Sequence, residues 1–126
     1  IPFEERETLI ILHGYGGSSV LFYSVMKQLV KCFNLVFVDI IGMAGSSRPN
    51  DFSEEFSPDQ IIDYFCGYME RWRVSMSVVI GKLKLKRQRK DPDTLRKENL
   101  EEFKNFIIAG HSFGGYIAGF YTVRYP

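Results

Sequence analysis

A serine suited to nucleophilic catalysis lies in the segment Gly110-His111-Ser112-Phe113-Gly114, which is followed by Gly115. The pattern is G-x-S-x-G. On a sharp turn between a strand and a helix, such a serine exposes its hydroxyl and can attack a carbonyl carbon. We expect glycine at 110 and 114 because side chains there would collide with neighbouring backbone. The alternative interpretation is a Gly/Ser turn that opens a helix and carries no chemistry.

A second glycine-rich segment, His13-Gly14-Tyr15-Gly16-Gly17, supplies backbone amides. Acyl transfer to a serine creates an oxyanion, and each N–H group aimed at it contributes about 3 kcal/mol. We expect the amides of Tyr15 and Phe113 to be the two donors. The segment lacks the glycine spacing of nucleotide phosphate loops, which disfavours phosphate binding by its backbone. This chemistry requires no metal and no organic cofactor.

The two histidines of the chain, His13 and His111, adjoin these segments. Neither is expected to be the general base, because His111 should project away from the hydroxyl and His13 ends a strand. We expect both rings to act as internal hydrogen-bond partners. Residues 113–126 contain no Asp, Glu or His. A serine hydroxyl needs a base to become nucleophilic, so we expect the chain to be an inactive part of a longer protein.

Three short apolar runs predict the strands that position these segments, at about residues 7–12, 34–39 and 105–110. Their length and branched side chains are typical of strands buried on both faces of a parallel sheet. Apolar residues at helical spacing predict helices at 20–31, at 58 to about 75 and at 116 to about 124, the second opened by a capping box. The sequence therefore predicts an α/β fold with three parallel strands and flanking helices.

Composition limits the function further. The chain has 126 residues, of which 45% are hydrophobic, and a net charge of +1. These values fit one globular domain and give no general attraction to nucleic acid. No apolar run approaches the roughly 20 residues of a membrane span. Cys32 and Cys66 are too few for a disulfide scaffold, so we expect reduced thiols and a cytoplasmic location.

The segment Lys82–Lys90 carries six basic residues and no acidic one. We interpret residues 78–104 as a basic insertion between a helix and the third strand. One interpretation is a solvated surface. The other is a peripheral contact with a membrane or lipid droplet, since each basic residue near an anionic lipid surface contributes about 1 kcal/mol. RNA binding is disfavoured because no pattern of stacking aromatic residues accompanies the charge.

Several motifs together resemble a known family. The chain resembles the α/β-hydrolase fold, and within it the branch of N-acyl phospholipid lipases and the lipid-droplet lipase coactivator. That branch has glycine where this chain has Ala44, which predicts a reshaped turn. The resemblance rests on His13–Gly17, on Asp39, Gly42, Ser46, Ser47, Arg48 and Pro49, on Glu70, Trp72, Arg73 and Met76, and on His111, Ser112, Gly114, Gly115 and Tyr116.

The resemblance implies that residues 1–126 are the N-terminal part of one α/β-hydrolase domain, with the first strand between the other two. It also implies hydrolysis or transfer of carboxylic esters, of lipids or phospholipids, through an acyl-Ser112 intermediate. The turn residues His13, Gly14, Gly110, His111, Gly114 and Gly115 would support that site. The alternative is a non-catalytic pseudohydrolase that binds lipid or a lipase partner, although the coactivator members lack the serine present here. A peptidase of the same fold is also left open.

Overall fold

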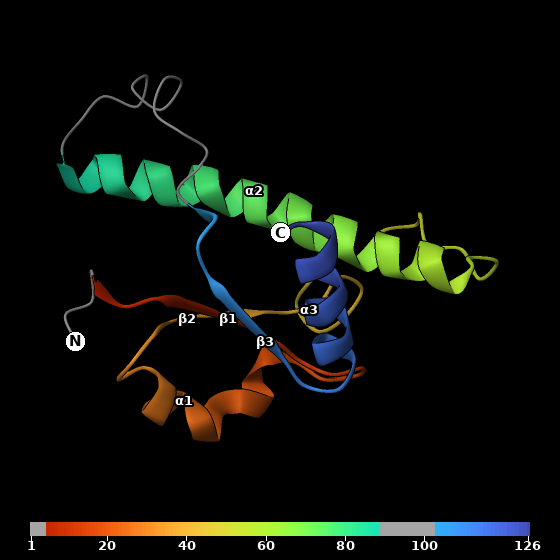
Figure 1. The fold of residues 1–126 in the computed structure, drawn as a ribbon, viewed down its shortest axis with the longest axis horizontal. Coiled ribbons are helices and arrows are strands. Elements are labelled where there is room, and N and C mark those ends of the chain that lie inside the picture. The colour runs from red at the N-terminus through yellow and green to blue at the C-terminus, as the bar shows by residue number, and fades with distance from the viewer. Residues whose placement is uncertain (1–4, 89–102) are drawn as a thin grey trace.

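The structure is a computed structural model that describes residues 5–88 and 103–126 (Figure 1). The predicted strands and helices are all found, with bounds that differ by a few residues except at the end of the helix predicted at 58 to about 75, which is much longer. They are the strands β1 (Thr8–Leu12), β2 (Asn34–Val38) and β3 (Ile107–Gly110), a 3-10 turn (Ser19–Phe22), and the helices α1 (Tyr23–Leu29), α2 (Pro58–Gln88) and α3 (Phe113–Arg124).

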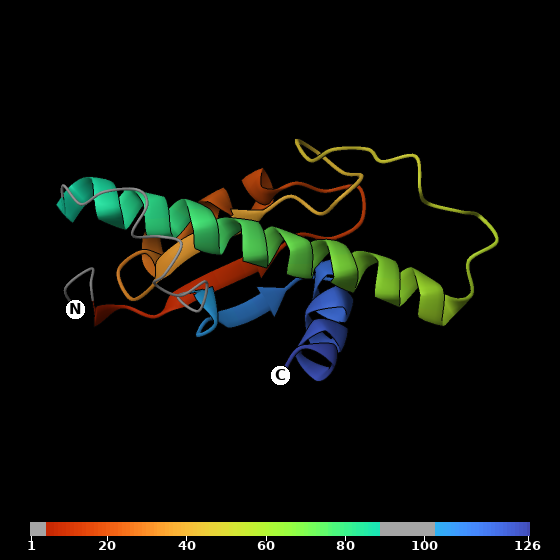
Figure 2. The same cartoon turned by 90° about the horizontal axis from the view of Figure 1, so that it is seen from above.

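The three strands form one parallel sheet in the order β2-β1-β3. The first strand is therefore central, as expected. In the register, Leu12 of β1 pairs with Val38 of β2 and with Gly110 of β3. The carboxyl ends of all three strands thus meet at one edge. Helix α1 lies on one face of the sheet, whereas α2 and α3 lie on the other (Figures 1 and 2).

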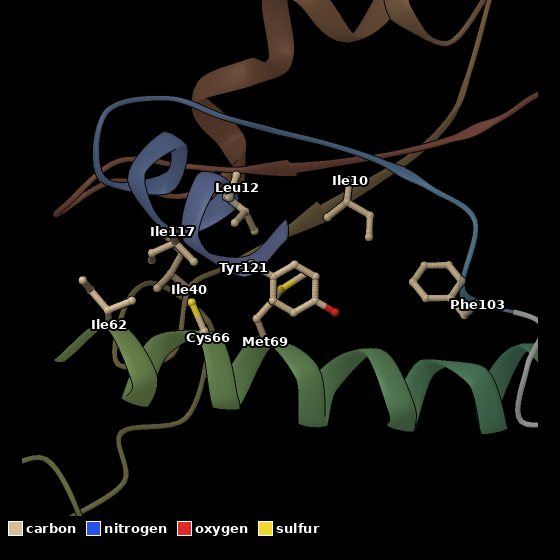
Figure 3. Packing of buried hydrophobic residues seen from close by; sticks show 10 residues of the cluster. Ile10, Leu12, Ile40, Ile62, Cys66, Met69, Phe103, Ile117 and Tyr121 are labelled. Carbon is tan, nitrogen blue, oxygen red and sulfur yellow. The ribbon is translucent and has the colours of Figure 1, made fainter. Parts of the chain in front are cut away.

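The hydrophobic core lies between the sheet and α2 (Figure 3). The spacing of the apolar residues on α2 is that of one helix face, which explains why this face is buried. Side chains of β1 and α3 point toward this face of α2. The buried members are Ile10 and Leu12 of β1, Ile40 after β2, Ile62, Cys66 and Met69 of α2, Phe103 before β3, and Ile117, Ala118 and Tyr121 of α3.

Burial on both faces holds for β1 but not for the other two strands. Leu9 to Leu12 are all buried. Strand β2 is only half-buried, and most of β3 is exposed, with Ile107 at 41%. The prediction that all three strands are buried on both faces is therefore wrong for β2 and β3. Strand β1 has a neighbour along both edges, whereas β2 and β3 each pair with β1 alone among the described residues.

Helix α2 begins where predicted and ends later. The amide of Ser57 donates to Gln60 Oε1 at 2.8 Å, and the amide of Gln60 donates to Ser57 Oγ at 3.3 Å, which confirms the capping box. The helix continues to Gln88 instead of ending near Ser75, because its Lys, Leu, Arg and Gln residues favour helix. Residues 78–88 of the predicted insertion therefore belong to α2, whereas residues 89–102, which include Arg89 and Lys90, lie outside the described residues.

No helix in the described part of the chain is long and apolar enough to cross a lipid bilayer. This includes α2, whose 31 residues would otherwise be sufficient in length. Cys32 is exposed and Cys66 is buried, and both are free thiols.

Candidate active site

Ser112 occupies the turn between β3 and α3 in a strained conformation. Its φ of 55° and ψ of −120° lie in a region that residues other than glycine rarely adopt. Such strain costs about 1–3 kcal/mol and persists only where the surrounding structure imposes it. The side chain is exposed. A sharp turn between strand and helix is what the G-x-S-x-G pattern predicts.

Two glycines make this turn possible. A Cβ atom on Gly110 would lie 2.2 Å from the carbonyl carbon of Gly114. A Cβ atom on Gly114 would lie 2.4 Å from the carbonyl oxygens of both Leu12 and His13. Both positions therefore require glycine, as expected, because α3 begins directly against the end of β1.

The His13–Gly17 segment lies beside Ser112. A Cβ atom on Gly14 would lie 3.2 Å from Ser112 Cβ and 3.3 Å from His111 Nδ1. These segments are far apart in sequence, and they meet because β1 and β3 are neighbours in a parallel sheet. The amide of His111 extends the pairing by donating to Leu12 O at 3.1 Å.

The two amides expected as oxyanion donors belong to the residues that directly follow Gly14 and Ser112. Tyr15 lies in a turn that the amide of Gly17 closes by donating to Gly14 O at 3.0 Å. Phe113 is the first residue of α3, where an amide has no partner within the helix. Neither amide takes part in a hydrogen bond within residues 5–88 and 103–126.

His13 is a buried structural residue, as predicted. Its Nε2 accepts the amide of Ile40 at 3.0 Å, and its Nδ1 lies 2.7 Å from Gly14 O. Because Nε2 accepts, the ring proton is assigned to Nδ1, which donates to that carbonyl. The N–H of a trans peptide points opposite to its C=O. By holding the Gly14 carbonyl, His13 therefore sets the direction of the Tyr15 amide.

His111 does not behave as predicted. Its side chain is exposed, and its ring makes no hydrogen bond to the described residues. The backbone makes the contacts instead, since His111 O accepts the amide of Gly114 at 3.0 Å. His111 therefore shapes the turn through its main chain. Its ring lies close to Gly14, where the absence of a side chain leaves room for it.

Asp39 anchors the loop that follows β2. Its carboxylate accepts the amide and hydroxyl of Ser19 at 2.9 and 2.5 Å and the amide of Gly45 at 3.1 Å. These donors, with the Ser19 hydroxyl first, hold the pKa of Asp39 below its ordinary value. The carboxylate is thus used structurally. Ala44 in the same loop has a φ of 45°, so the backbone keeps a conformation suited to glycine.

Glu70 and Arg73 join three segments. Arg73 donates two hydrogen bonds to the Glu70 carboxylate, at 2.8 and 2.7 Å, and a third to Phe103 O at 3.1 Å. The hydroxyl of Tyr121 in α3 donates to Glu70 at 2.6 Å. Arg73 is the main reason that the pKa of Glu70 is lowered. This motif on α2 therefore holds α3 and the chain before β3 in place.

A hollow of about 590 Å³ adjoins the Tyr15–Gly17 turn. Its floor is aromatic, with Phe52 and Tyr64 rings 5.2 Å apart. Phe65 also lines the hollow, and its ring lies 5.0 Å from that of Phe113, the residue that follows Ser112. The remaining lining residues come from the loop after β2 and are Ile41, Gly42, Met43, Ala44, Arg48 and Pro49.

Sequence reasoning did not place the aromatic residues of this hollow at the site. The available signal was the density of Phe and Tyr between residues 52 and 65. A separate cavity of about 250 Å³ lies between the end of β2 and α2, with Met69, Trp72 and Ile117 in its lining. In the described residues, no three His, Cys, Asp or Glu side chains are grouped closely enough to hold a metal ion.

A parallel sheet covered by helices on both faces, with a serine turn at the carboxyl edge of its strands, defines an α/β protein of hydrolase architecture. The chain belongs to the alpha/beta hydrolase fold family, which its sequence matches over residues 7–126.

The chain is similar to several lipid enzymes. A 1-acylglycerol-3-phosphate O-acyltransferase of Arabidopsis thaliana is 32% identical, over 100% of this chain and 24% of the relative. A (lyso)-N-acylphosphatidylethanolamine lipase of Bos taurus is 29% identical, over 97% of this chain and 28% of the relative. The chain thus spans about a quarter of the length of these curated relatives. No solved structure matches it.

Proposed function

We propose that Ser112 is the nucleophile of a serine hydrolase or acyltransferase that acts on lipid esters. The observation that carries this proposal is the strained Ser112 turn directly beside Gly14. The Ser112 hydroxyl oxygen attacks the ester carbonyl, and the amides of Tyr15 and Phe113 stabilise the oxyanion. The alcohol of the ester leaves with a proton, and the acyl group stays on Ser112 as an ester. Water or an acceptor alcohol then takes the acyl group and restores the hydroxyl.

The proposal places the general base elsewhere in the complete protein. Both ring nitrogens of His13 are occupied by Gly14 O and the Ile40 amide. Asp39 is likewise engaged by Ser19 and Gly45. The proposal thus regards residues 1–126 as the N-terminal part of one hydrolase domain with an insertion at 78–104, and the acid and base as residues outside it.

Lipid esters are the substrate class that the surroundings of Ser112 support best. The aromatic floor formed by Phe52, Tyr64 and Phe65 offers apolar surface to an acyl chain. The similar proteins carry the names of an acylglycerol-phosphate acyltransferase and a phosphatidylethanolamine lipase. Contact between Lys82–Lys90 and an anionic lipid surface belongs to the same proposal.

The test is covalent labelling of the complete protein with an uncharged fluorophosphonate. We expect labelling of the native protein and none of Ser112→Ala, with the modified residue located by peptide mass spectrometry. Ser24→Ala is the matched control, because Ser24 is an exposed serine on α1, and it should label normally. Absence of labelling in folded native protein would overturn the proposal and favour the non-catalytic lipid- or lipase-binding alternative.

A further inference from the structure

The hollow of about 590 Å³ adjoins the Tyr15–Gly17 turn. It shares the turn that carries the proposed oxyanion donor, and Phe65 joins its floor to Phe113 next to the serine. Its lining combines apolar and aromatic side chains with tyrosine hydroxyls and glycine backbone. Among the described residues, Arg48 is the one charged side chain that lines this hollow.

The Arg48 guanidinium is available to a ligand. It donates to Ser46 O and Ala44 O, each at 3.3 Å, which is long for a hydrogen bond. In residues 5–88 and 103–126 it pairs with no carboxylate. A guanidinium has five N–H donors, so donors are left over. The Arg48 side chain is exposed. Its two long hydrogen bonds are with the backbone of its own loop, which lines the hollow.

No carboxylate of the described residues forms an ion pair with Arg48. Asp51 is only three positions away, but its oxygens accept the hydroxyls of Tyr64 at 2.9 Å and Tyr68 at 2.7 Å. Asp39 is bound by Ser19 and Gly45. The hollow therefore combines aromatic side chains with one guanidinium that forms no ion pair among the described residues.

We infer that Arg48 binds the phosphate of a phosphorylated acyl lipid whose ester is presented to Ser112. This inference rests on the proposed function and names its substrate class. A guanidinium forms two parallel hydrogen bonds with a phosphate or a carboxylate, and the similar proteins are named for phosphate-containing lipids. The acyl chain of the same lipid lies on Phe52, Tyr64 and Phe65. Arg48 thereby selects phosphorylated over neutral lipid esters.

The experiment compares two lipids with the same acyl chain, a 1-acylglycerol-3-phosphate and a monoacylglycerol, in neutral detergent micelles with the complete protein. We expect Arg48→Gln to lower the ratio of kcat/KM for the phosphorylated lipid to that for the neutral lipid by about 10- to 100-fold, the usual effect of losing a hydrogen bond to a charged group. Arg48→Lys should retain part of the ratio. An unchanged ratio in Arg48→Gln would overturn the inference.

Two matched measurements distinguish phosphate binding at Arg48 from a general effect of positive charge. Lys31→Gln removes a positive charge from an exposed lysine that donates to Gln28, and it should leave the ratio unchanged. Inorganic phosphate should raise KM for the phosphorylated lipid alone. If it inhibits both lipids equally, it does not compete specifically with the lipid phosphate, and the inference fails.

The outcomes also separate the role of Arg48 from the proposed function. Native protein that does not label at Ser112 and cleaves neither lipid defeats the proposed function itself. Labelled protein with an unchanged ratio in Arg48→Gln defeats only the role of Arg48.

Discussion

At the scale of single residues, two positions among residues 5–88 and 103–126 that are not glycine, Ala44 and Ser112, have a left-handed backbone. At Ser112 the strain accompanies an exposed hydroxyl beside Gly14 and is consistent with function. At Ala44 no such use is seen. Ala44 therefore bears the steric cost of a positive φ.

We therefore predict that Ala44→Gly stabilises the complete protein by about 1 kcal/mol, because glycine adopts a positive φ without steric cost. Thermal unfolding measures the change. Ala118→Gly, in the buried part of α3, is the contrasting substitution and should destabilise by about 1 kcal/mol. Equal destabilisation by both substitutions would show that Ala44 is not strained.

His13 is a positioning residue for the proposed oxyanion donor, because it holds the Gly14 carbonyl and thereby orients the Tyr15 amide. Replacing His13 by Phe leaves this carbonyl and the buried Ile40 amide without partners. We expect destabilisation of about 1–3 kcal/mol. We also expect kcat to fall at least about 10-fold with little change in KM, because the oxyanion forms in the transition state and not in the bound substrate. A folded variant with unchanged kcat contradicts this role.

At the scale of elements, α2 organises the chain. Its capping box starts it at Pro58, its apolar face covers the sheet, and Glu70 connects it to α3 through Tyr121. This connection matters for the site because α3 begins one residue after Ser112. Movement of α3 relative to α2 would therefore shift the serine turn.

A double-mutant cycle tests this connection. Tyr121→Phe removes the hydroxyl that donates to Glu70 at 2.6 Å, and we expect a loss of about 1.5–3 kcal/mol, typical of a hydrogen bond to a charged group. Glu70→Gln also weakens the bonds from Arg73. The two changes should be non-additive by at least about 0.5 kcal/mol in urea unfolding. Strict additivity would mean that the hydroxyl and the carboxylate do not stabilise each other.

At the scale of the whole molecule, carboxylates make stability depend on pH. Hydrogen bonds from Ser19 and from Arg73 lower the pKa values of Asp39 and Glu70 in the folded state. Unfolded carboxyls titrate near pH 4, so the folded state binds fewer protons in this range. The resulting stability is fully present above about pH 5 and is lost as the pH falls through the folded pKa values.

We predict that the free energy of unfolding falls between about pH 5 and pH 3, as measured by urea denaturation at several pH values. In the double variant Asp39→Asn, Glu70→Gln, this decline should be shallower, because the two groups no longer titrate. The variant should also be less stable than the native protein at pH 7. An identical decline in both proteins would show that other groups cause the pH dependence.

The surface of the described residues predicts that the isolated 126-residue chain associates. Val20, Leu21 and Val123 are 77%, 67% and 77% exposed, and β2 and β3 each pair on one edge only. Exposed apolar groups and open strand edges favour self-association. Size-exclusion chromatography should show oligomers or aggregates. A monodisperse monomer with a sharp melting transition would contradict this prediction.

Local patterns in the sequence were sufficient for the elements and for part of the site. The apolar run before His13 predicts β1, the Ser57–Gln60 pair predicts the start of α2, and G-x-S-x-G predicts the turn at Ser112. Each depends largely on sterics or hydrogen bonds among residues close in sequence, as at Gly110, where a Cβ atom would meet the backbone of Gly114. Such signals can be interpreted without knowledge of the rest of the fold.

Only the tertiary structure decided which of these segments meet and what covers them. The contact of Gly14 with Ser112 depends on β1 and β3 being neighbours, and the role of His13 depends on the distant Ile40 amide. The hollow beside Arg48 and the unequal burial of the strands have the same origin. Contacts between residues far apart in sequence depend on packing energies summed over the whole chain, and a local motif contains no information about that sum.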